Sequence, residues 1–241
     1  MKIRVAIQSY KFNKRLCWML SSILQQTGDL PDIEVSVSYF VNTGVKELLC
    51  VFRRAGLLIN GHEYVDWGRF KRRGFVRNRD LKIGGVRVID ADWILWADSD
   101  MVYPPNFFSM MKSLCNTTFA DNLKCLHSGR RSTFLDETEL LVNKYNYPCI
   151  VPNAFIQANK LKSKKKRNIG AGYCQITNVD SLFSNFGGIY VKGRCDRDWD
   201  TRGQKAISDI RFRKRLGAEK IPLPWQVHLQ HLRSMPNERD C

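Results

Sequence analysis

Two aspartates separated by one residue follow a short apolar run near the middle of the chain. Residues 93–97 are wholly apolar, and Asp98-Ser99-Asp100 comes directly after them. Hard divalent cations such as Mg²⁺ and Mn²⁺ prefer carboxylate oxygens, and a cation bound between this pair and a diphosphate would neutralise a leaving nucleotide. Such a triplet recurs by chance, but its position at the end of an apolar strand favours a metal site over an exposed turn.

The segments before the triplet alternate between strand and helix patterns. Residues 3–9 form a β-branched run, residues 16–24 carry apolar side chains at helical spacing, and residues 33–40 are apolar at odd positions. A strand, a helix and a strand open a doubly wound sheet, in which residues 93–97 would be a central strand buried on both faces. The sequence therefore predicts an α/β fold with a mixed, mostly parallel sheet flanked by helices. In such folds ligands bind at the carboxyl ends of the strands, where the triplet lies.

The remaining segments have less regular patterns. Residues 45–67 predict a short helix with a strand near residues 57–59, and Pro104-Pro105 should precede a helix at residues 106–114. The other predicted elements are a strand around residues 124–127, an ordered segment at residues 168–176 and a helix at residues 205–216.

Length and composition place the chain among ordinary globular proteins. It has 241 residues, of which 44% are hydrophobic and 26% charged, enough for one substantial domain. It contains no apolar run of the roughly 18 residues that a membrane span requires and no signal peptide, so we expect a cytoplasmic protein without a transmembrane segment. Its eight cysteines are scattered singly, and we expect them to be free thiols.

Positive charge is the unusual bulk property. The chain has 39 Lys and Arg against 23 Asp and Glu, a formal net charge of +16 and a pI near 9.7. This excess favours a polyanionic partner, nucleic acid first and an anionic membrane surface second, although a basic protein need not bind either. The cationic run at residues 160–167 predicts an exposed, mobile loop. The candidate polyanion-binding residues are Arg72, Arg73, Lys164, Lys165, Lys166 and Arg167.

Several short motifs surround the aspartate triplet. They are Arg77-Asn78-Arg79, the apolar strand that ends in Asp98-Ser99-Asp100, Pro104 and Phe107-Phe108. Together they resemble the donor half of GT-A glycosyltransferases, particularly the large inverting family 2. The resemblance covers residues 3–110 well and residues 168–231 moderately. It implies a single GT-A domain, whose residues 1–114 bind a nucleotide sugar and whose residues 115–241 bind the acceptor.

The resemblance also implies roles in donor binding. Asp98, Ser99 and Asp100 would bind the nucleotide diphosphate together with Mn²⁺ or Mg²⁺, and Asp100 would be a metal ligand. Arg77 would lie near the donor, although an arginine within a basic cluster can equally be a surface residue. By family likeness alone, the donor would be a UDP-sugar.

Residues 208–217 resemble the family segment that contains the catalytic base. By this likeness Asp209 would take the proton from the acceptor hydroxyl as it attacks the anomeric carbon. A single positioned base favours inversion of that carbon, but the sequence does not exclude retention. Ser208 departs from the pattern, because the family usually has Glu there. An aspartate at a helix start can also serve only to stabilise the helix. The alternative bases are Asp196, Asp198 and Asp200.

The end of the chain adds candidate metal ligands. Residues 225–231 contain His228 and His231, two of the four histidines. GT-A enzymes often complete the metal shell with a late histidine, so either could be a ligand, but the spacing suits two surface residues as well. Gly170-Ala171-Gly172 loosely resembles the stretch before the acceptor site, where the backbone approaches a sugar closely.

The fold does not indicate which acceptor is used, so the prediction of the acceptor rests on the charge distribution. Basic clusters on loops around the donor edge could neutralise several phosphates of a duplex and give salt-sensitive binding. We therefore hypothesise that the acceptor is DNA carrying a hydroxymethylated pyrimidine, flipped into the site. Two alternatives stay open. One is glycosylation of a polysaccharide or lipid-linked glycan at an anionic membrane, and the other is a non-catalytic nucleic-acid-binding module with a GT-A-like core.

Overall fold

The fold is seen in a computed structural model, which describes the central sheet and the helices packed against it. The described residues are 1–10, 13–71, 76, 90–117, 174–180 and 182, together with short strands at 82–83, 86–87, 126–127, 130–132, 219–220 and 226–228.

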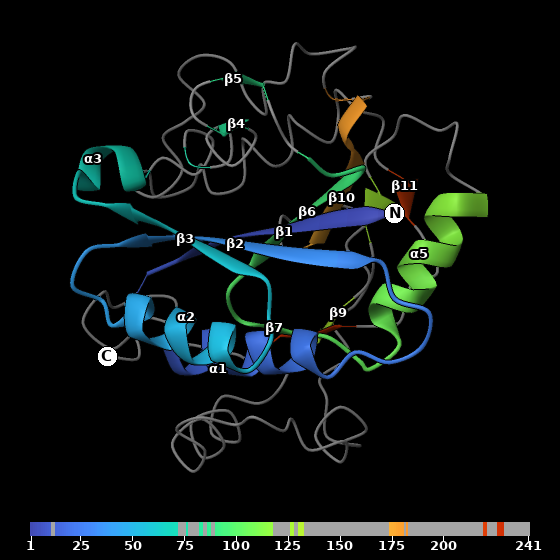
Figure 1. The fold of residues 1–241 in the computed structure, drawn as a ribbon, viewed down its shortest axis with the longest axis horizontal. Coiled ribbons are helices and arrows are strands. Elements are labelled where there is room, and N and C mark those ends of the chain that lie inside the picture. Colours follow the sequence, from blue (N-terminus) through green and yellow to red (C-terminus); the bar gives the residue numbers. More distant parts are fainter. Residues whose placement is uncertain are drawn as a thin grey trace.

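A seven-stranded sheet forms the centre of the molecule, in the order β11-β8-β10-β6-β1-β2-β3 (Figure 1). Its strands are β1 (Lys2–Ser9), β2 (Asp32–Phe40), β3 (Ile59–Tyr64), β6 (Trp93–Asp98), β8 (Leu126–His127), β10 (Cys174–Asn178) and β11 (Glu219–Lys220). The four strands β6, β1, β2 and β3 are parallel, whereas β10 runs antiparallel to β6. The predicted α/β fold with a mixed, mostly parallel sheet is therefore confirmed.

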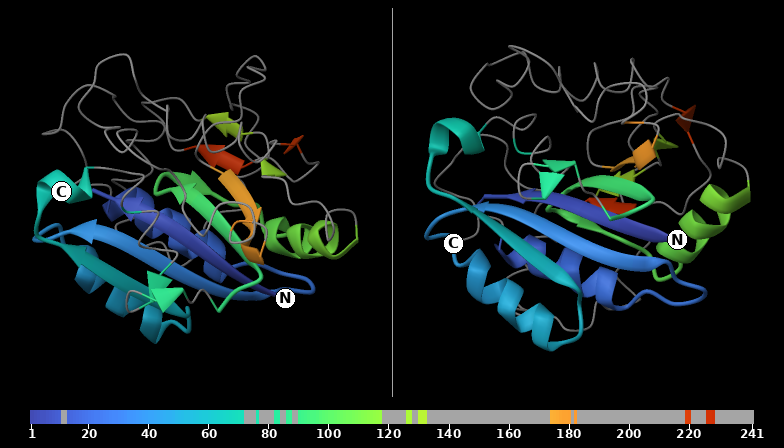
Figure 2. Two further views of the ribbon diagram at one scale, coloured as in Figure 1. Left: turned by 90° about the horizontal axis from the view of Figure 1, so that it is seen from above. Right: turned by 45° about the horizontal axis from the view of Figure 1, so that its top comes forward.

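Three helices pack in the main core on one face of this sheet, as Figure 2 shows for α1 and α2. They are α1 (Asn13–Leu24), α2 (Val45–Arg54) and α5 (Phe107–Thr117). The short helix α3 (Trp67–Phe70) lies on the other side of the sheet from α1 and α2, in a separate small cluster (Figure 1). Two smaller sheets are also present, β7-β12-β9 and β4-β5. Their strands are β4 (Lys82–Ile83), β5 (Val86–Arg87), β7 (Met101–Val102), β9 (Arg130–Ser132) and β12 (Gln226–His228).

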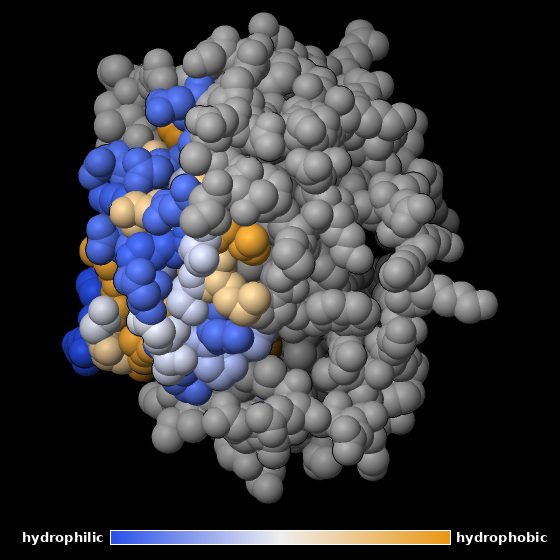
Figure 3. Space-filling view, turned by 90° about the vertical axis from the view of Figure 1, so that its right-hand side faces the viewer, coloured by the Kyte–Doolittle hydropathy of each residue, from blue (hydrophilic) through white to orange (hydrophobic). Residues whose placement is uncertain are grey.

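The core lies between the sheet and the helices because successive strand residues point to opposite faces. Ile3, Val5 and Ile7 of β1 are fully buried and share one cluster with residues of α1, α2 and α5. Burial of each such side chain stabilises the fold by about 1.5–3 kcal/mol. On the end of the molecule near α5, hydrophilic residues predominate among the described residues (Figure 3).

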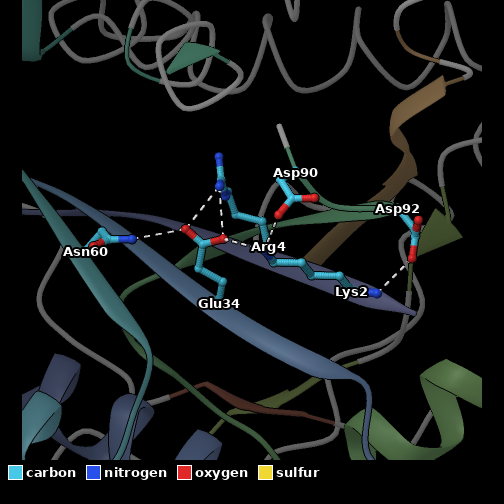
Figure 4. Close-up of polar contacts among 6 residues, drawn as sticks. All are labelled: Lys2, Arg4, Glu34, Asn60, Asp90 and Asp92. Carbon is cyan, nitrogen blue, oxygen red and sulfur yellow. Dashed lines mark hydrogen bonds and ion pairs between the residues drawn. The ribbon is translucent and has the colours of Figure 1, made fainter. Parts of the chain in front are cut away.

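The opposite face of the sheet carries a buried ion pair near the amino ends of the strands (Figure 4). Arg4 Nη2 donates hydrogen bonds to both carboxylate oxygens of Glu34, at 3.0 and 2.9 Å. Asn60 Nδ2 donates to the same carboxylate at 3.0 Å. The Arg4 and Glu34 side chains are only 5% and 10% exposed, so each compensates the other's charge away from water.

Most predicted elements match the structure, but the strand expected near residues 57–59 is misplaced. Gly56 has a φ of 96°, which ends the α2 segment, and Leu58 is 58% exposed in the connection that follows. The strand is β3, which is mostly polar because it forms an edge of the sheet. The predicted helix at residues 205–216 and the basic run at residues 160–167 lie outside the described residues.

Two bulk expectations can be compared with the described residues. None of the helices among them is long and apolar enough to cross a membrane. Cys17, Cys50 and Cys115 are free thiols, as expected. Burial raises the pKa of the Cys115 thiol to about 12, so it stays protonated and unreactive at neutral pH.

The buried ion pair predicts an asymmetric response to mutation. Arg4→Met removes the cation that is hydrogen-bonded to the buried Glu34 and leaves only Lys2 Nζ, at 3.8 Å. It should lower the free energy of unfolding by about 3 kcal/mol in urea titrations. The double variant Arg4→Met with Glu34→Met should recover most of this loss. Lys112→Met is the control, since Lys112 pairs with the exposed Asp29 and should cost less than about 1 kcal/mol. Equal losses for Arg4→Met and Lys112→Met would contradict the burial argument.

Candidate active site at the carboxyl end of the sheet

The parallel strands bring several polar and aromatic residues to one edge of the sheet. Gln8 at the end of β1 lies opposite Asp98 at the end of β6, in register. On the other side of β1, its last residue Ser9 lies opposite Tyr39 of β2. Carboxyl ends of parallel strands are where open α/β folds bind their ligands. The aspartate triplet therefore occupies the expected position in the sheet.

The triplet is sheltered from solvent. Ser99 and Asp100 are 5% and 6% exposed, and Asp98 is half-buried. Buried carboxylates are stabilised by hydrogen bonds or cations, and two carboxylates one residue apart form a donor set that suits Mg²⁺ or Mn²⁺. Among residues whose side chains are described, no three acidic, histidine or cysteine side chains gather.

The short strand after the triplet brings the end of the chain to the site. β7 pairs antiparallel with β12, so that His228 lies opposite Met101, the residue next to Asp100. Opposed residues in such ladders have Cα atoms about 4.5–5.5 Å apart. The backbone of His228 therefore lies close to the triplet. His231, the other candidate, lies outside the described residues.

A third strand completes this small sheet, and sequence reasoning did not anticipate it. β9 pairs parallel with β12, which places Ser132 beside His228 and Arg131 beside Val227. Strands of two or three residues are too short to show a periodic pattern in the sequence. The strands with which they pair are also far away along the chain. Sequence reasoning selected the late histidines but could not choose between them, whereas the pairing places the backbone of one beside the triplet.

An aromatic cluster lies at the same edge of the main sheet, and sequence reasoning also missed it. Tyr10 and Trp67 have ring centroids 4.6 Å apart, and Phe40 lies 5.3 Å from Trp67. Tyr64 and Phe70 are buried beneath them, with centroids 5.5 Å apart. Trp67 is 37% exposed. Tyr10, Phe40 and Tyr64 lie at or directly after the ends of strands. Their common position at one edge of the sheet can be recognised only after the strands have been assigned.

Gln8 connects the two parts of this edge. Its Nε2 donates a hydrogen bond to the carbonyl oxygen of Phe70, while its backbone pairs with that of Asp98. Asp66 caps α3, which carries Trp67 and Phe70 of the cluster, by accepting a hydrogen bond from the Arg69 N–H. The aromatic cluster and the triplet are thus positioned by neighbouring strands of one sheet.

The other predicted site residues lie outside the part of the chain that the structure describes. They are Arg77 for the donor, Asp209 as the base, and Arg72, Arg73, Lys164, Lys165, Lys166 and Arg167 for a polyanion. Their roles remain predictions.

Comparison with known proteins gives a match in fold but none in sequence. No protein-family model matches the sequence. No curated protein matches it either. Among solved structures, S. aureus TarS 1–349 in complex with UDP has a TM-score of 0.61 at 13% identity, over 94% of this chain and 60% of that chain. The Pyrobaculum calidifontis mannosyltransferase PcManGT, in complex with GDP-Man and Mn²⁺, has a TM-score of 0.59 at 15% identity, over 96% and 58%.

These similarities define the class of fold. The chain has the α/β fold of GT-A glycosyltransferases, with the same mixed, mostly parallel sheet flanked by helices. It spans about 60% of TarS 1–349 and 36% of the longer TarS chain. At identities of 12% to 15% the likeness is one of fold.

The pairing of β7 with β12 predicts which histidine assists metal binding. His228→Gln should weaken Mn²⁺ binding, measured by titration calorimetry in the presence of UDP, by tenfold or more, or about 1.4 kcal/mol. His231→Gln is the matched control and should change the affinity less than about twofold. If His231→Gln weakened Mn²⁺ binding more than His228→Gln, the pairing of β7 with β12 would not identify the metal ligand.

Proposed function

We propose that this protein is a metal-dependent glycosyltransferase that moves a sugar from a nucleoside-diphosphate sugar to an acceptor hydroxyl. The observation that carries the proposal is the sheltered pair Asp98 and Asp100 at the carboxyl end of a central strand in a GT-A fold. Solved structures that share the fold include TarS 1–349 in complex with UDP and with UDP-GlcNAc, and PcManGT in complex with GDP-Man and Mn²⁺.

The residues at this edge divide naturally between the two ends of a nucleotide. Asp98 and Asp100 would hold Mn²⁺ or Mg²⁺, which supplies positive charge to the diphosphate as it leaves. The exposed ring surface of Trp67, beside Tyr10, suits the base, because aromatic rings stack on any nucleobase. Gln8 joins these two regions, and Arg77 would add positive charge near the donor.

The donor and the stereochemistry are further parts of the proposal. We favour a UDP-sugar, which agrees with the UDP and UDP-GlcNAc named for TarS. Asp209 would act as the general base, removing the acceptor proton while the hydroxyl oxygen bonds to the anomeric carbon and the bond to the diphosphate breaks. One displacement of this kind inverts the anomeric carbon.

The acceptor proposal rests on charge. A net charge of +16 favours a polyanion, and DNA carrying a 5-hydroxymethylpyrimidine offers both phosphates and a hydroxyl nucleophile. The base would have to leave the stack to reach the site. A polysaccharide or a lipid-linked glycan at an anionic membrane is the competing acceptor.

Donor use can be tested separately from the acceptor. The wild-type protein with Mn²⁺ should bind a UDP-sugar and slowly hydrolyse it, as measured by calorimetry and UDP release. Asp98→Asn should weaken the metal-dependent binding by at least tenfold, because one charged ligand is lost. Glu63→Gln is a matched control, since this exposed carboxylate lies on the edge strand β3. Binding that is indifferent to both metal and Asp98→Asn would contradict the proposed function.

The identity of the base predicts a different kinetic signature. Asp209→Asn should preserve donor binding but reduce transfer by about 100-fold or more, because general-base catalysis contributes about 10²–10⁴-fold. Asp196→Asn, Asp198→Asn and Asp200→Asn should each retain transfer. If one of these three loses transfer while Asp209→Asn remains active, that residue is the base.

The acceptor assay uses mass spectrometry of nucleosides. DNA with and without 5-hydroxymethylcytosine or 5-hydroxymethyluracil is incubated with the protein, Mn²⁺ and a panel of nucleotide sugars. The modified nucleoside alone should gain the mass of a sugar. Sugar gain only on polysaccharide or lipid acceptors would exclude DNA, and DNA binding without any transfer or hydrolysis would indicate a non-catalytic module.

A further inference from the structure

The segment that follows the aspartate triplet is hydrogen-bonded to the last turn of α1 and to the residues directly after that helix. The Tyr103 N–H donates to Ser22 Oγ at 3.1 Å, and the Phe108 N–H donates to Gln26 Oε1 at 3.1 Å. Gln26 Nε2 donates to the Pro104 carbonyl at 2.9 Å. These three bonds join residues about 80 positions apart in the sequence. We call Ser22 and Gln26 the α1 clamp.

The clamp satisfies backbone groups that the segment cannot satisfy by itself. Pro104 and Pro105 have no N–H, so residues 103–106 cannot form a regular ladder or helix. The Phe108 N–H belongs to the first turn of α5, whose amides have no partner within the helix. Gln26 is only 8% exposed and supplies both a donor and an acceptor there.

The clamp itself is held in place by α1. Ser22 Oγ donates to the Met19 carbonyl at 2.7 Å, and Gln26 Nε2 also donates to the Ser22 carbonyl at 2.8 Å. Met19 is fully buried in the main core. Hydrogen bonds to carbonyl groups of α1 therefore hold both clamp side chains. As a result, the position of α1 determines where the segment after the triplet lies.

We propose that Ser22 and Gln26 are positioning residues for the candidate metal site. Tyr103 follows β7 directly, and β7 separates it from Asp100 while pairing with the strand of His228. The α1 clamp thus sets where β7 lies, and β7 sets the relation between the second aspartate and the late histidine. The part of this proposal that concerns metal binding rests on the proposed function.

The first test measures the clamp without any ligand. In hydrogen-exchange mass spectrometry, Gln26→Leu should increase amide exchange in residues 101–108 at least tenfold while leaving β1 and β2 protected. Ile23→Val or Ile23→Ala is the control, whichever lowers the melting temperature by the same amount, because Ile23 is a core residue of the same helix. Exchange in residues 101–108 that is equal in the two variants would overturn the clamp.

The second test measures positioning. At matched melting temperature, Gln26→Leu should weaken Mn²⁺-dependent UDP binding about tenfold, whereas the Ile23 variant should bind as the wild type does. Equal affinities for the two variants would overturn the positioning role. If Gln26→Leu fails to fold, Ser22→Ala removes the bond to Tyr103 and the local bond to the Met19 carbonyl but leaves those of Gln26, and it should show both effects at smaller size. A wild-type protein that binds neither Mn²⁺ nor UDP would refute the proposed function and the positioning role, and hydrogen exchange alone would then decide whether the clamp exists.

Discussion

The pairing of β6 with β1 is the constraint on which the rest of the site depends. The register runs from Ile3 opposite Trp93 to Gln8 opposite Asp98, and both strands are buried in the middle of the sheet. β6 is apolar on both faces, and Trp93, Leu95 and Ala97 point into the main core. Because side chains alternate with a period of two, a slip of one residue would turn the face that carries Asp98 toward that core. The cost of burying the Asp98 carboxylate there fixes where β6 ends and therefore where the aspartate triplet begins.

Beyond the end of β6, position is determined by contacts with distant parts of the chain. β7 has only two residues and contributes little by itself. It lies between two supports: α1, through the bonds of Ser22 and Gln26, and β12, through the pairing of His228 with Met101. The short segment of β7 and the two prolines after it can therefore keep a defined position, because it is bonded on one side to α1 and on the other side to β12.

The features that the sequence predicts well are those with a local, repeating signal. α1 carries apolar residues at helical spacing, and β6 is an uninterrupted apolar run, so both follow from burial alone. β3 was misplaced because an edge strand exposes part of its surface, and the apolar Leu57-Leu58 pair lies in the preceding connection. The β7–β12 pairing and the aromatic cluster depend on contacts between segments that are distant in the sequence, for which a single sequence carries no signal.

The charges along the sheet also explain why a cation belongs in the proposed chemistry. At the amino ends, Glu34 is balanced by Arg4 within hydrogen-bonding distance. At the carboxyl ends, two aspartates stand one residue apart on a sheltered turn. Two carboxylates repel a diphosphate, even in a chain with a net charge of +16, because the interaction at short range is stronger than that of distant, screened charges. Under the proposed function, a divalent cation would reverse the sign of that local field, and nucleotide-sugar binding at this edge would require the metal.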